Sequence, residues 1–279
     1  MERKPVIGFV GAGKVGQALG RYFGRSGLTV RGYCSRSLES AQKAAAVTGT
    51  AVLPLEELTA ASDILFLTVP DGVIEEIWQT VRFLPLEGKV ICHCSGLHSF
   101  RILTGIEETG GTGYSLHPLC AITGSFDDLA QVYFTLDHAE EHQAMNTLLA
   151  QIKNPVCRIE AAQKAKYHAA AVFCSNLVAG ITHAGSRLFL ECGLEAEFAQ
   201  RAWRQLFLGN AQNIERLGPV QALTGPLERA DDQTIHLHLE ALDEPAREIY
   251  RLLSLELLAV AQAKNPGRNY LKVEELLKR

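Results

Sequence analysis

Three glycines near the N-terminus have the spacing found in turns that bind phosphate groups. Gly11, Gly13 and Gly16 form G-x-G-x-x-G directly after the apolar run Val6–Val10, and helix-forming residues follow from Val15. This order predicts a buried strand, a tight turn and a helix whose N-terminus attracts a pyrophosphate. A plain structural turn is the alternative. The residues expected to contact a dinucleotide here are Gly11, Ala12, Gly13, Lys14, Val15 and Gly16.

The end of the second predicted strand, Thr29–Cys34, indicates which dinucleotide is bound. NAD(H) is usually held by a carboxylate about 20 residues past the glycines, but this chain has Ser35, Arg36 and Ser37 there. Arg36 could pair with the 2′-phosphate of NADP(H), and the two serines could donate to it. We therefore expect NADP(H) rather than NAD(H). Alternatively, Ser37 only caps the next helix and Arg36 is a solvated charge.

Other polar or glycine-bearing stretches also fall at the ends of predicted strands. Ligands of open parallel sheets bind outside the carboxyl ends of the strands, so these stretches should share one edge. Val69 and Pro70 are expected to contact the cofactor, and Ser95, Gly96 and His117 the substrate. The stretches are Gly11–Gly16, Ser35–Arg36, Thr68–Asp71, Ser95–Gly96 and His117–Pro118.

The elements that must position these residues change in kind along the chain. The predicted strands are Val6–Val10, Thr29–Cys34, Ala51–Leu53, Ile64–Val69, Val90–Cys94, Gly113–Leu116 and Val132–Leu136. From Glu160 only helices are predicted, over Ala161–Leu190, Glu197–Leu217, Asp231–Leu242, Pro245–Ala263 and a short Leu271–Lys278. The fold class is therefore α/β, with a Rossmann-like doubly wound parallel sheet followed by an all-α domain. We place the NADP-binding domain at 1–155 and the helical substrate and dimerisation domain at 156–279.

One polar stripe marks the first long helical stretch, Ala161–Leu190. At about 100° per residue, Lys164, His168 and Ser175 point within about 40° of one another, and Asn176 lies in a neighbouring stripe. Alanine and valine surround these residues, which suggests that the stripe faces protein. Buried polar groups need partners, and a substrate could be one.

The composition of the chain limits the classes of function that we expect. The 279 residues include 47% hydrophobic and 21% charged ones, and the net charge of −4 gives no reason to expect binding to nucleic acid or an anionic membrane. Seven scattered cysteines, with no signal-peptide or membrane-spanning pattern, favour a cytoplasmic protein. Cys92, Cys94, His93 and His98 suggest a metal site, but the two cysteines face away from His93 along a strand and no second pair completes the site. We expect no metal.

The chain resembles the Rossmann-like proteins that carry a C-terminal domain of the DUF2520 type. The motifs are V-G-A-G-K-V-G at 10–16, H-C-S-G at 93–96, S-L-H-P-L at 115–119, Y-H-A-A-A-V-F-C-S-N at 167–176 and L-T-G-P-L-E-R-A-D at 223–231. This group is distantly related to pyrroline-5-carboxylate reductase, ketopantoate reductase and the 6-phosphogluconate dehydrogenase superfamily. The resemblance implies an NADP-linked oxidoreductase, homodimeric through a helical domain like the C-terminal one of that superfamily. One departure is Ala230, where the group commonly has glycine.

The predicted reaction is hydride transfer to or from a small carbonyl or imine, such as the 2-oxo acid ketopantoate. Such a site needs a proton donor and groups that polarise the acceptor. We assign His168 as donor, with Lys164 in support and Asn176 as a positioning amide; the lysine and asparagine resemble the arrangement in ketopantoate reductase. Ser95 and Gly96 would hold a carboxylate or carbonyl, with His117 and Ser175 lining the same site.

Several alternatives stay open. His168 could be an ordinary helix histidine, and His117, which precedes a proline, could serve only a turn. The protein could bind NADP(H) as a sensor or scaffold without turnover. It could also reduce pyrroline-5-carboxylate as an imine reductase, although L-T-G-P at 223–226 differs from that enzyme's proline-then-glycine loop. The likeness of the nucleotide domain to NADP reductases that use a deazaflavin coenzyme keeps this second cofactor open.

Overall fold

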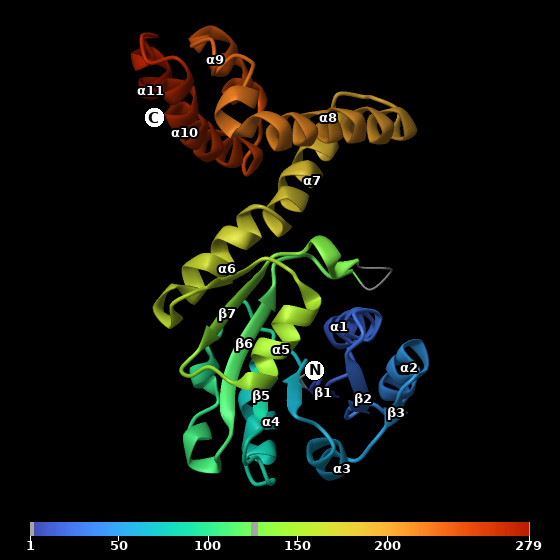
Figure 1. The fold of residues 1–279 in the computed structure, drawn as a ribbon. Helices are drawn as coiled ribbons and strands as arrows, with labels where there is room; N and C mark the ends of the chain where they lie inside the picture. Colours follow the sequence, from blue (N-terminus) through green and yellow to red (C-terminus); the bar gives the residue numbers. More distant parts are fainter. Residues whose placement is uncertain (1–2, 124–127, 279) are drawn as a thin grey trace. The chain divides into compact units, whose positions relative to one another are not determined.

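A computed structural model describes residues 3–123 and 128–278. Contacts divide the chain into two compact units, Met1–Ser175 and Asn176–Arg279, each described here by itself (Figure 1). This division falls beyond residue 155, where the sequence places the end of the nucleotide domain, because one further helix packs with the first unit. The functional boundary itself stays a prediction.

The first unit is built on one sheet whose strand order is β3-β2-β1-β4-β5-β6-β7-β8. The first six strands pair in parallel in the order of a Rossmann domain, which confirms the predicted fold class. β7 runs antiparallel to β6, and β8 runs parallel to β7. The strands are β1 (Val6–Val10), β2 (Thr29–Cys34), β3 (Ala51–Val52), β4 (Ile64–Leu67), β5 (Val90–His93), β6 (Thr112–Pro118), β7 (Phe134–His138) and β8 (Val156–Arg158).

Both faces of this sheet are covered, as the uninterrupted apolar runs predict. Buried strand residues alternate between two apolar clusters: Ile7, Phe9, Ile64 and Phe66 in one, and Val10, Leu65, Leu67 and Ile91 in the other. The helices of this unit are α1 (Lys14–Arg25), α2 (Leu38–Thr48), α3 (Leu55–Ala60), α4 (Ile74–Val81), α5 (Gln143–Ile152) and α6 (Lys164–Phe173), joined by short 3₁₀ turns. The predicted strands differ from the observed ones only at their ends, and β8 was not predicted.

The predicted single helix over Ala161–Leu190 is wrong. A 3₁₀ turn covers Ala161–Gln163, α6 follows, and α7 (Asn176–Glu191) is a separate helix. α6 ends because the N–H of Ser175 bonds to the carbonyl three residues back, at Val172, instead of continuing the α-helical pattern. Helical periodicity continues through this point, so the sequence pattern did not reveal the break.

The second unit is entirely helical in its described residues, as predicted. It contains α7, α8 (Ala196–Ala222), α9 (Asp232–Ala241), α10 (Ala246–Lys264) and α11 (Leu271–Leu277). α8 is interrupted at Gly218, whose φ is 72° and which precedes Pro219, close to the predicted helix end at Leu217. The apolar core of the second unit includes Leu227, Ile235, Leu258, Ala261, Val273 and Leu277.

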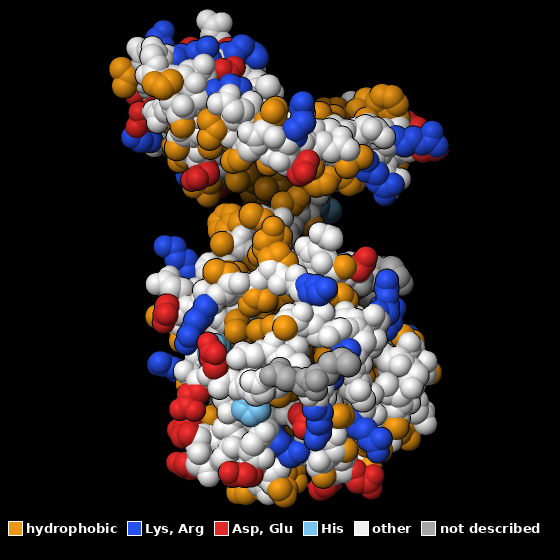
Figure 2. Space-filling view, viewed as in Figure 1, with side chains coloured by type: hydrophobic (Ala, Val, Ile, Leu, Met, Phe, Trp, Pro, Cys, Tyr) orange, Lys and Arg blue, Asp and Glu red, His pale blue; other side chains and the backbone are white. Residues whose placement is uncertain are grey.

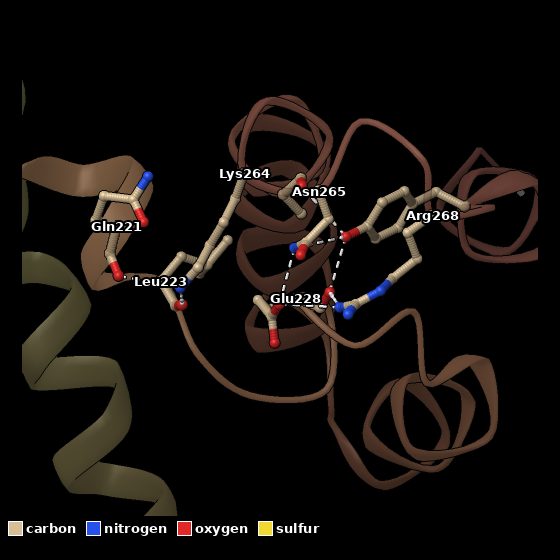
Figure 3. A network of polar contacts seen from close by, with 8 residues as sticks. Gln221, Leu223, Glu228, Lys264, Asn265 and Arg268 are labelled. Atoms are coloured by element: carbon tan, nitrogen blue, oxygen red, sulfur yellow. Dashed lines mark hydrogen bonds and ion pairs between the residues drawn. The ribbon is translucent and has the colours of Figure 1, made fainter.

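The loop motif Leu223–Asp231 is fixed by side chains that follow α10 (Figure 3). The Glu228 carboxylate accepts hydrogen bonds from Asn265 (2.8 Å) and Arg268 (2.9 Å). These contacts, the one with Asn265 first, lower the pKa of Glu228. Lys264 donates to two backbone carbonyls at the end of α8, at 2.7 and 3.0 Å. The motif is therefore held in one conformation by its own domain.

Ala230, the position at which the sequence departs from the motif of the group it resembles, lies in the left-handed region with φ of 59°. The Asp231 N–H bonds to Pro226 O at 2.9 Å and the Asp232 N–H to Ala230 O at 3.1 Å, which fixes this backbone turn. A Cβ atom in this conformation costs about 1–2 kcal/mol, whereas glycine adopts it without that cost. The departure from the motif therefore leaves the turn intact but strained.

Ala230→Gly should raise the free energy of unfolding by about 1 kcal/mol, since relief of the strain exceeds the loss of one methyl group. Ala259→Gly, at an exposed position inside α10, is the matched control and should lower it by about 1 kcal/mol. Chemical denaturation measures both. Destabilisation by Ala230→Gly of the same size as in the control would contradict this account.

Candidate functional site

The glycine turn after β1 has the geometry that the motif predicts. Gly11 has φ of 100°, and a Cβ atom on it would lie 2.5 Å from the Thr68 carbonyl oxygen. A Cβ on Gly16 would lie 2.6 Å from Thr68 Oγ1, whereas one on Gly13 would meet nothing within 4 Å. The first and third glycines therefore allow close packing within the protein, and Gly13 leaves open space at the start of α1.

This open space borders the free N-terminus of α1. Gly13 is the N-cap and no side chain caps the helix, so the first backbone N–H groups, from Lys14 to Gly16, have no acceptor within the helix. Val69 lies against the same turn, because a Cβ on Gly11 would be 3.0 Å from Val69 Cγ1. The structure thus brings the predicted cofactor residues of β1 and β4 to one place, with donors suited to an anion.

At the end of β2, the three predicted residues have different surroundings. Arg36 is exposed and makes no hydrogen bond or ion pair within the part of the chain that the structure describes. Ser37 Oγ accepts a hydrogen bond from Ser40 N at 3.2 Å and so caps α2. Ser35 is half-buried between β2 and Arg36. The arginine is therefore available to a ligand, whereas the Ser37 hydroxyl already serves the helix.

Ser95, after β5, uses its hydroxyl within the protein. It donates to Asp71 at 2.8 Å and accepts from Leu97 N at 3.1 Å and His98 N at 3.0 Å. One donor and two acceptor positions are all that a hydroxyl offers. Binding of a substrate by this hydroxyl, as predicted from the sequence, would require one of these bonds to break. Asp71, which sequence reasoning did not include among the site residues, follows β4 and orients Ser95.

His93 is a buried structural residue beneath this loop. Its Nδ1 accepts from Ser95 N at 3.2 Å, and its Nε2 lies 3.1 Å from Ser99 O, so a hydrogen on Nε2 satisfies both contacts. Burial lowers the pKa of His93 to about 4. Its neighbour Cys92 is also buried, and burial raises the pKa of that thiol. No cluster of three or more metal-ligating side chains occurs in residues 3–123 and 128–278.

Lys164 at the start of α6 is 1% exposed, and its ammonium bridges two strand ends. Its Nζ donates to Ser95 O at 2.9 Å and to Ser115 Oγ at 2.8 Å. Burial lowers the pKa of Lys164, and the negative charge of Asp137 on β7 opposes this effect. The lysine thus ties α6 to β5 and β6. Ser115 was part of a quoted motif, but its role was not predicted.

Two imidazoles lie over Gly96. A Cβ on Gly96 would be 2.7 Å from His168 Cδ2 and 2.9 Å from His117 Nε2. The ring centroids of His117 and His168 are 6.4 Å apart, with 76° between the ring planes. On its other side, His117 Nδ1 is 2.8 Å from the Tyr167 hydroxyl. A side chain at residue 96 would force one or both rings to move, so the glycine fits the observed packing whatever it binds.

The periods of β6 and α6 explain this convergence. Ser115 and His117 are two residues apart, so they project from one face of the strand. Lys164, Tyr167 and His168 are three and four residues apart, so they share one face of the helix. Lys164 contacts Ser115, and Tyr167, one turn further, contacts His117. α6 therefore runs along β6 toward the carboxyl edge of the sheet.

The remaining predicted residues lie at the division between the units. Ser175 is the last residue of the first unit, and its Oγ donates to Ala171 O at 2.7 Å. Asn176 begins α7 and belongs to the second unit. The contacts that bring Ser95, Gly96, His117, Lys164 and His168 together lie within the first unit and include neither Ser175 nor Asn176. The predicted roles of Ser175 and Asn176 in the site therefore stay predictions.

The fold and the motifs together define a class, that of the Rossmann-like proteins. Residues 2–118 match the Rossmann-like domain, and residues 132–257 match the domain of unknown function DUF2520. The chain therefore belongs to the Rossmann-like proteins that carry a DUF2520 domain, as its motifs predict. None of the curated proteins compared with it matches.

Several solved structures share this fold over nearly the whole chain. A candidate NADP oxidoreductase from Bacteroides fragilis is 22% identical, with a TM-score of 0.75, 92% of this chain covered and 98% of that one. A protein from Thermotoga maritima is 25% identical, with a TM-score of 0.73 and 92% and 99% covered. A pyrroline-5-carboxylate reductase from Coxiella burnetii is 16% identical, with a TM-score of 0.64 and 96% and 100% covered. At this identity the likeness concerns the fold.

The helices give one further negative result. No helix in the described residues is both long enough and apolar enough to cross a membrane.

The buried neutral state of His93 predicts acid sensitivity. A histidine in the unfolded chain binds a proton near pH 6.5, whereas in the folded protein its pKa is about 4. Between these values the unfolded state binds more protons, so the free energy of unfolding should fall as the pH falls from about 6.5 to 4, by on the order of 3 kcal/mol from His93.

Denaturation at several pH values between 7 and 4.5 measures this slope. His93→Gln should reduce the slope, although it also lowers stability at pH 7 by changing two hydrogen bonds. His183→Gln, at an exposed position on α7, should leave the slope unchanged. Equal slopes in the wild type and His93→Gln would contradict the expected low pKa.

Proposed function

We propose that this protein is an NADP(H)-dependent oxidoreductase that transfers a hydride to or from a small carbonyl or imine compound. The observation that carries the proposal is a convergence at one edge of the sheet. Three features follow carboxyl ends of strands in the first unit: the uncapped start of α1 at Gly13, the imidazoles over Gly96, and Arg36, which has no partner among the described residues. The fold shared with solved reductases supports the same reaction class.

The residues present fit an NADP(H) molecule. The N–H groups from Lys14 to Gly16 would bind the pyrophosphate, and Gly13 has no side chain to exclude it. Arg36 would pair with the 2′-phosphate, and Val69 and Pro70 would line the path toward the nicotinamide. When bound, the reduced nicotinamide supplies the hydride.

His168 is the group that we propose to hold and deliver a proton. It is half-buried, and its ring edge faces Gly96 beside His117. Lys164 cannot itself contact a substrate in this arrangement, because its ammonium is buried and bonded to Ser95 and Ser115. Its part in the reaction is then to hold α6, and with it His168, in place.

The substrate class follows from the acceptor chemistry. Both a carbonyl and an imine gain a proton when they accept a hydride, so an imidazole donor serves either. A 2-oxo acid such as ketopantoate is our first candidate, and a cyclic imine such as pyrroline-5-carboxylate is the second. A sensor that binds NADP(H) without turnover is the alternative from another class, and the imidazole pair over Gly96 favours catalysis over it.

We also propose a homodimer formed through the helical unit. Apolar side chains gather over α7 and α8 (Figure 2). Soluble monomers rarely expose large contiguous apolar patches. The exposed ones include Ile181, Leu190, Phe198, Leu206, Phe207 and Leu208, with Leu206 68% exposed. A second copy of this chain would cover them.

Arg36→Gln should weaken NADPH binding roughly 10- to 100-fold, because a charge-assisted pair with the 2′-phosphate is lost. NADH, which lacks this phosphate, should bind the variant and the wild type with similar affinity. Fluorescence titration of the reduced cofactors measures both constants. Arg31→Gln, at an exposed position on β2, the strand that precedes Arg36, is the control and should change neither. Unchanged NADPH affinity in Arg36→Gln would reject this role.

His168→Ala should lower the rate of NADPH oxidation roughly 100-fold or more with the best acceptor among 2-oxo acids and cyclic imines, because the proton donor is removed. The affinity for NADPH should stay within about twofold, since His168 lies over Gly96 and not at the glycine turn. An undiminished rate would remove His168 from the mechanism. Binding of NADPH by the wild type with no turnover across the screen would favour the sensor.

A further inference from the structure

We propose that Tyr167 and His117 act as one unit in which the tyrosine hydroxyl donates to Nδ1 and holds the hydrogen of the imidazole on Nε2. His117 then presents this N–H beside Gly96 as a fixed hydrogen-bond donor to the atom that gains negative charge when the substrate accepts a hydride. The second statement rests on the proposed function, whereas the first concerns the free protein. Tyr167 is thereby a positioning residue, and His117 a catalytic one distinct from His168.

The pairing of the two side chains is the first observation. The Tyr167 hydroxyl and His117 Nδ1 are 2.8 Å apart, and the two rings meet edge to face with centroids 5.6 Å apart. Among the described residues, His117 Nδ1 is the one partner within hydrogen-bond distance of the Tyr167 hydroxyl, and the Thr135 hydroxyl also lies near enough to affect the pKa of the phenol. Thr135, opposite His117 in the pairing of β6 with β7, has a buried hydroxyl that makes no hydrogen bond. Nδ1 is therefore the acceptor for the tyrosine hydrogen.

The direction of this bond follows from counting donors. If Nδ1 carried the hydrogen, the phenol would accept it, and its own hydrogen could turn only toward the Thr135 hydroxyl, which makes no hydrogen bond in the structure. With the phenol as donor, both atoms of the pair are satisfied. Burial raises the pKa of Tyr167, against a smaller opposite effect of the Thr135 hydroxyl, so the phenol keeps its hydrogen. A neutral imidazole then carries its single hydrogen on Nε2.

The surroundings keep this imidazole neutral. Burial, and after it the positive charge of Lys164, lowers the pKa of His117 to about 4. A neutral ring donates from one nitrogen only, so the partner of Nδ1 decides what Nε2 can do. An imidazolium would donate from both nitrogens and could not accept from the phenol. The Tyr167 contact therefore matters only because the site excludes the charged form.

The free nitrogen faces the proposed substrate position. Nε2 lies 2.9 Å from the place that a Cβ on Gly96 would take, next to the His168 ring. It has no hydrogen-bond partner in the described residues. Because it is absent from the fully buried side-chain atoms that lack a partner, it is not sealed from its surroundings. A ligand at the end of β5 can thus reach it. A preorganised N–H at that point stabilises developing charge without having to reorient.

The tautomer can be read from ¹⁵N NMR of histidine-labelled full-length protein at pH 7, with no cofactor or substrate added. We expect the His117 Nδ1 signal of an unprotonated, hydrogen-bonded nitrogen and the Nε2 signal of a protonated one, assigned by their loss in His117→Gln. Tyr167→Phe should give a mixture of tautomers. A protonated Nδ1 in the wild type, or an unchanged tautomer in Tyr167→Phe, would overturn the proposal.

Tyr114→Phe is the matched control for this measurement. Tyr114 is a buried tyrosine whereas Tyr167 is half-buried, and its hydroxyl donates to Glu140 O at 2.7 Å and not to His117. The His117 signals should stay unchanged in it. The signals of His93, which makes no contact with either tyrosine hydroxyl, report in each variant whether the first unit is folded.

The catalytic part is tested by steady-state kinetics with the acceptor that the screen identifies. Tyr167→Phe should lower kcat roughly tenfold, because only part of the population then presents Nε2–H, and should leave the affinity for NADPH unchanged. An unchanged kcat together with an altered tautomer would overturn the role of His117 as donor. Failure of every acceptor would reject the proposed function, and the NMR result would still decide the tautomer.

Discussion

The hydrogen bonds of the buried Lys164 ammonium are the constraint on which the candidate site depends. An ammonium withdrawn from water is costly unless it is bonded and opposed by negative charge, and here Ser95 O, Ser115 Oγ and the nearby Asp137 serve these needs. Because the lysine is in the first turn of α6, its anchoring fixes the residues one turn later. Tyr167 and His168 reach the strand ends for this reason.

Much of the fold could be predicted because local signals agreed with one another. The strands Val6–Val10 and Thr29–Cys34 were predicted with their observed bounds, because a glycine or a serine follows each of them directly, at Gly11 and Ser35. The direction of β7 and the break after α6 at Cys174 were not foreseen. Both depend on contacts between distant segments, and neither leaves a mark in hydrophobic periodicity.

The sequence predicted where the candidate site lies better than it predicted what each of its residues does. Strand ends pointed to Ser95, Gly96 and His117, and the structure brings them together with residues of α6. The sequence could not show that the Ser95 hydroxyl is already engaged by Asp71, or that the lysine is sealed from solvent. Such facts arise from hydrogen bonds between elements far apart in the chain, which residue types and spacing do not specify.

The place where α6 belongs decides how the chain could be divided. A fragment that stops at residue 155 would lose the Lys164 ammonium, which donates hydrogen bonds to Ser95 O and Ser115 Oγ, and it would lose the His168 ring beside Gly96. A fragment that continues to Ser175 would keep them all. The sheet and the polar residues at its carboxyl edge therefore form one structural unit that extends to Ser175, although α6 follows the last strand in the sequence.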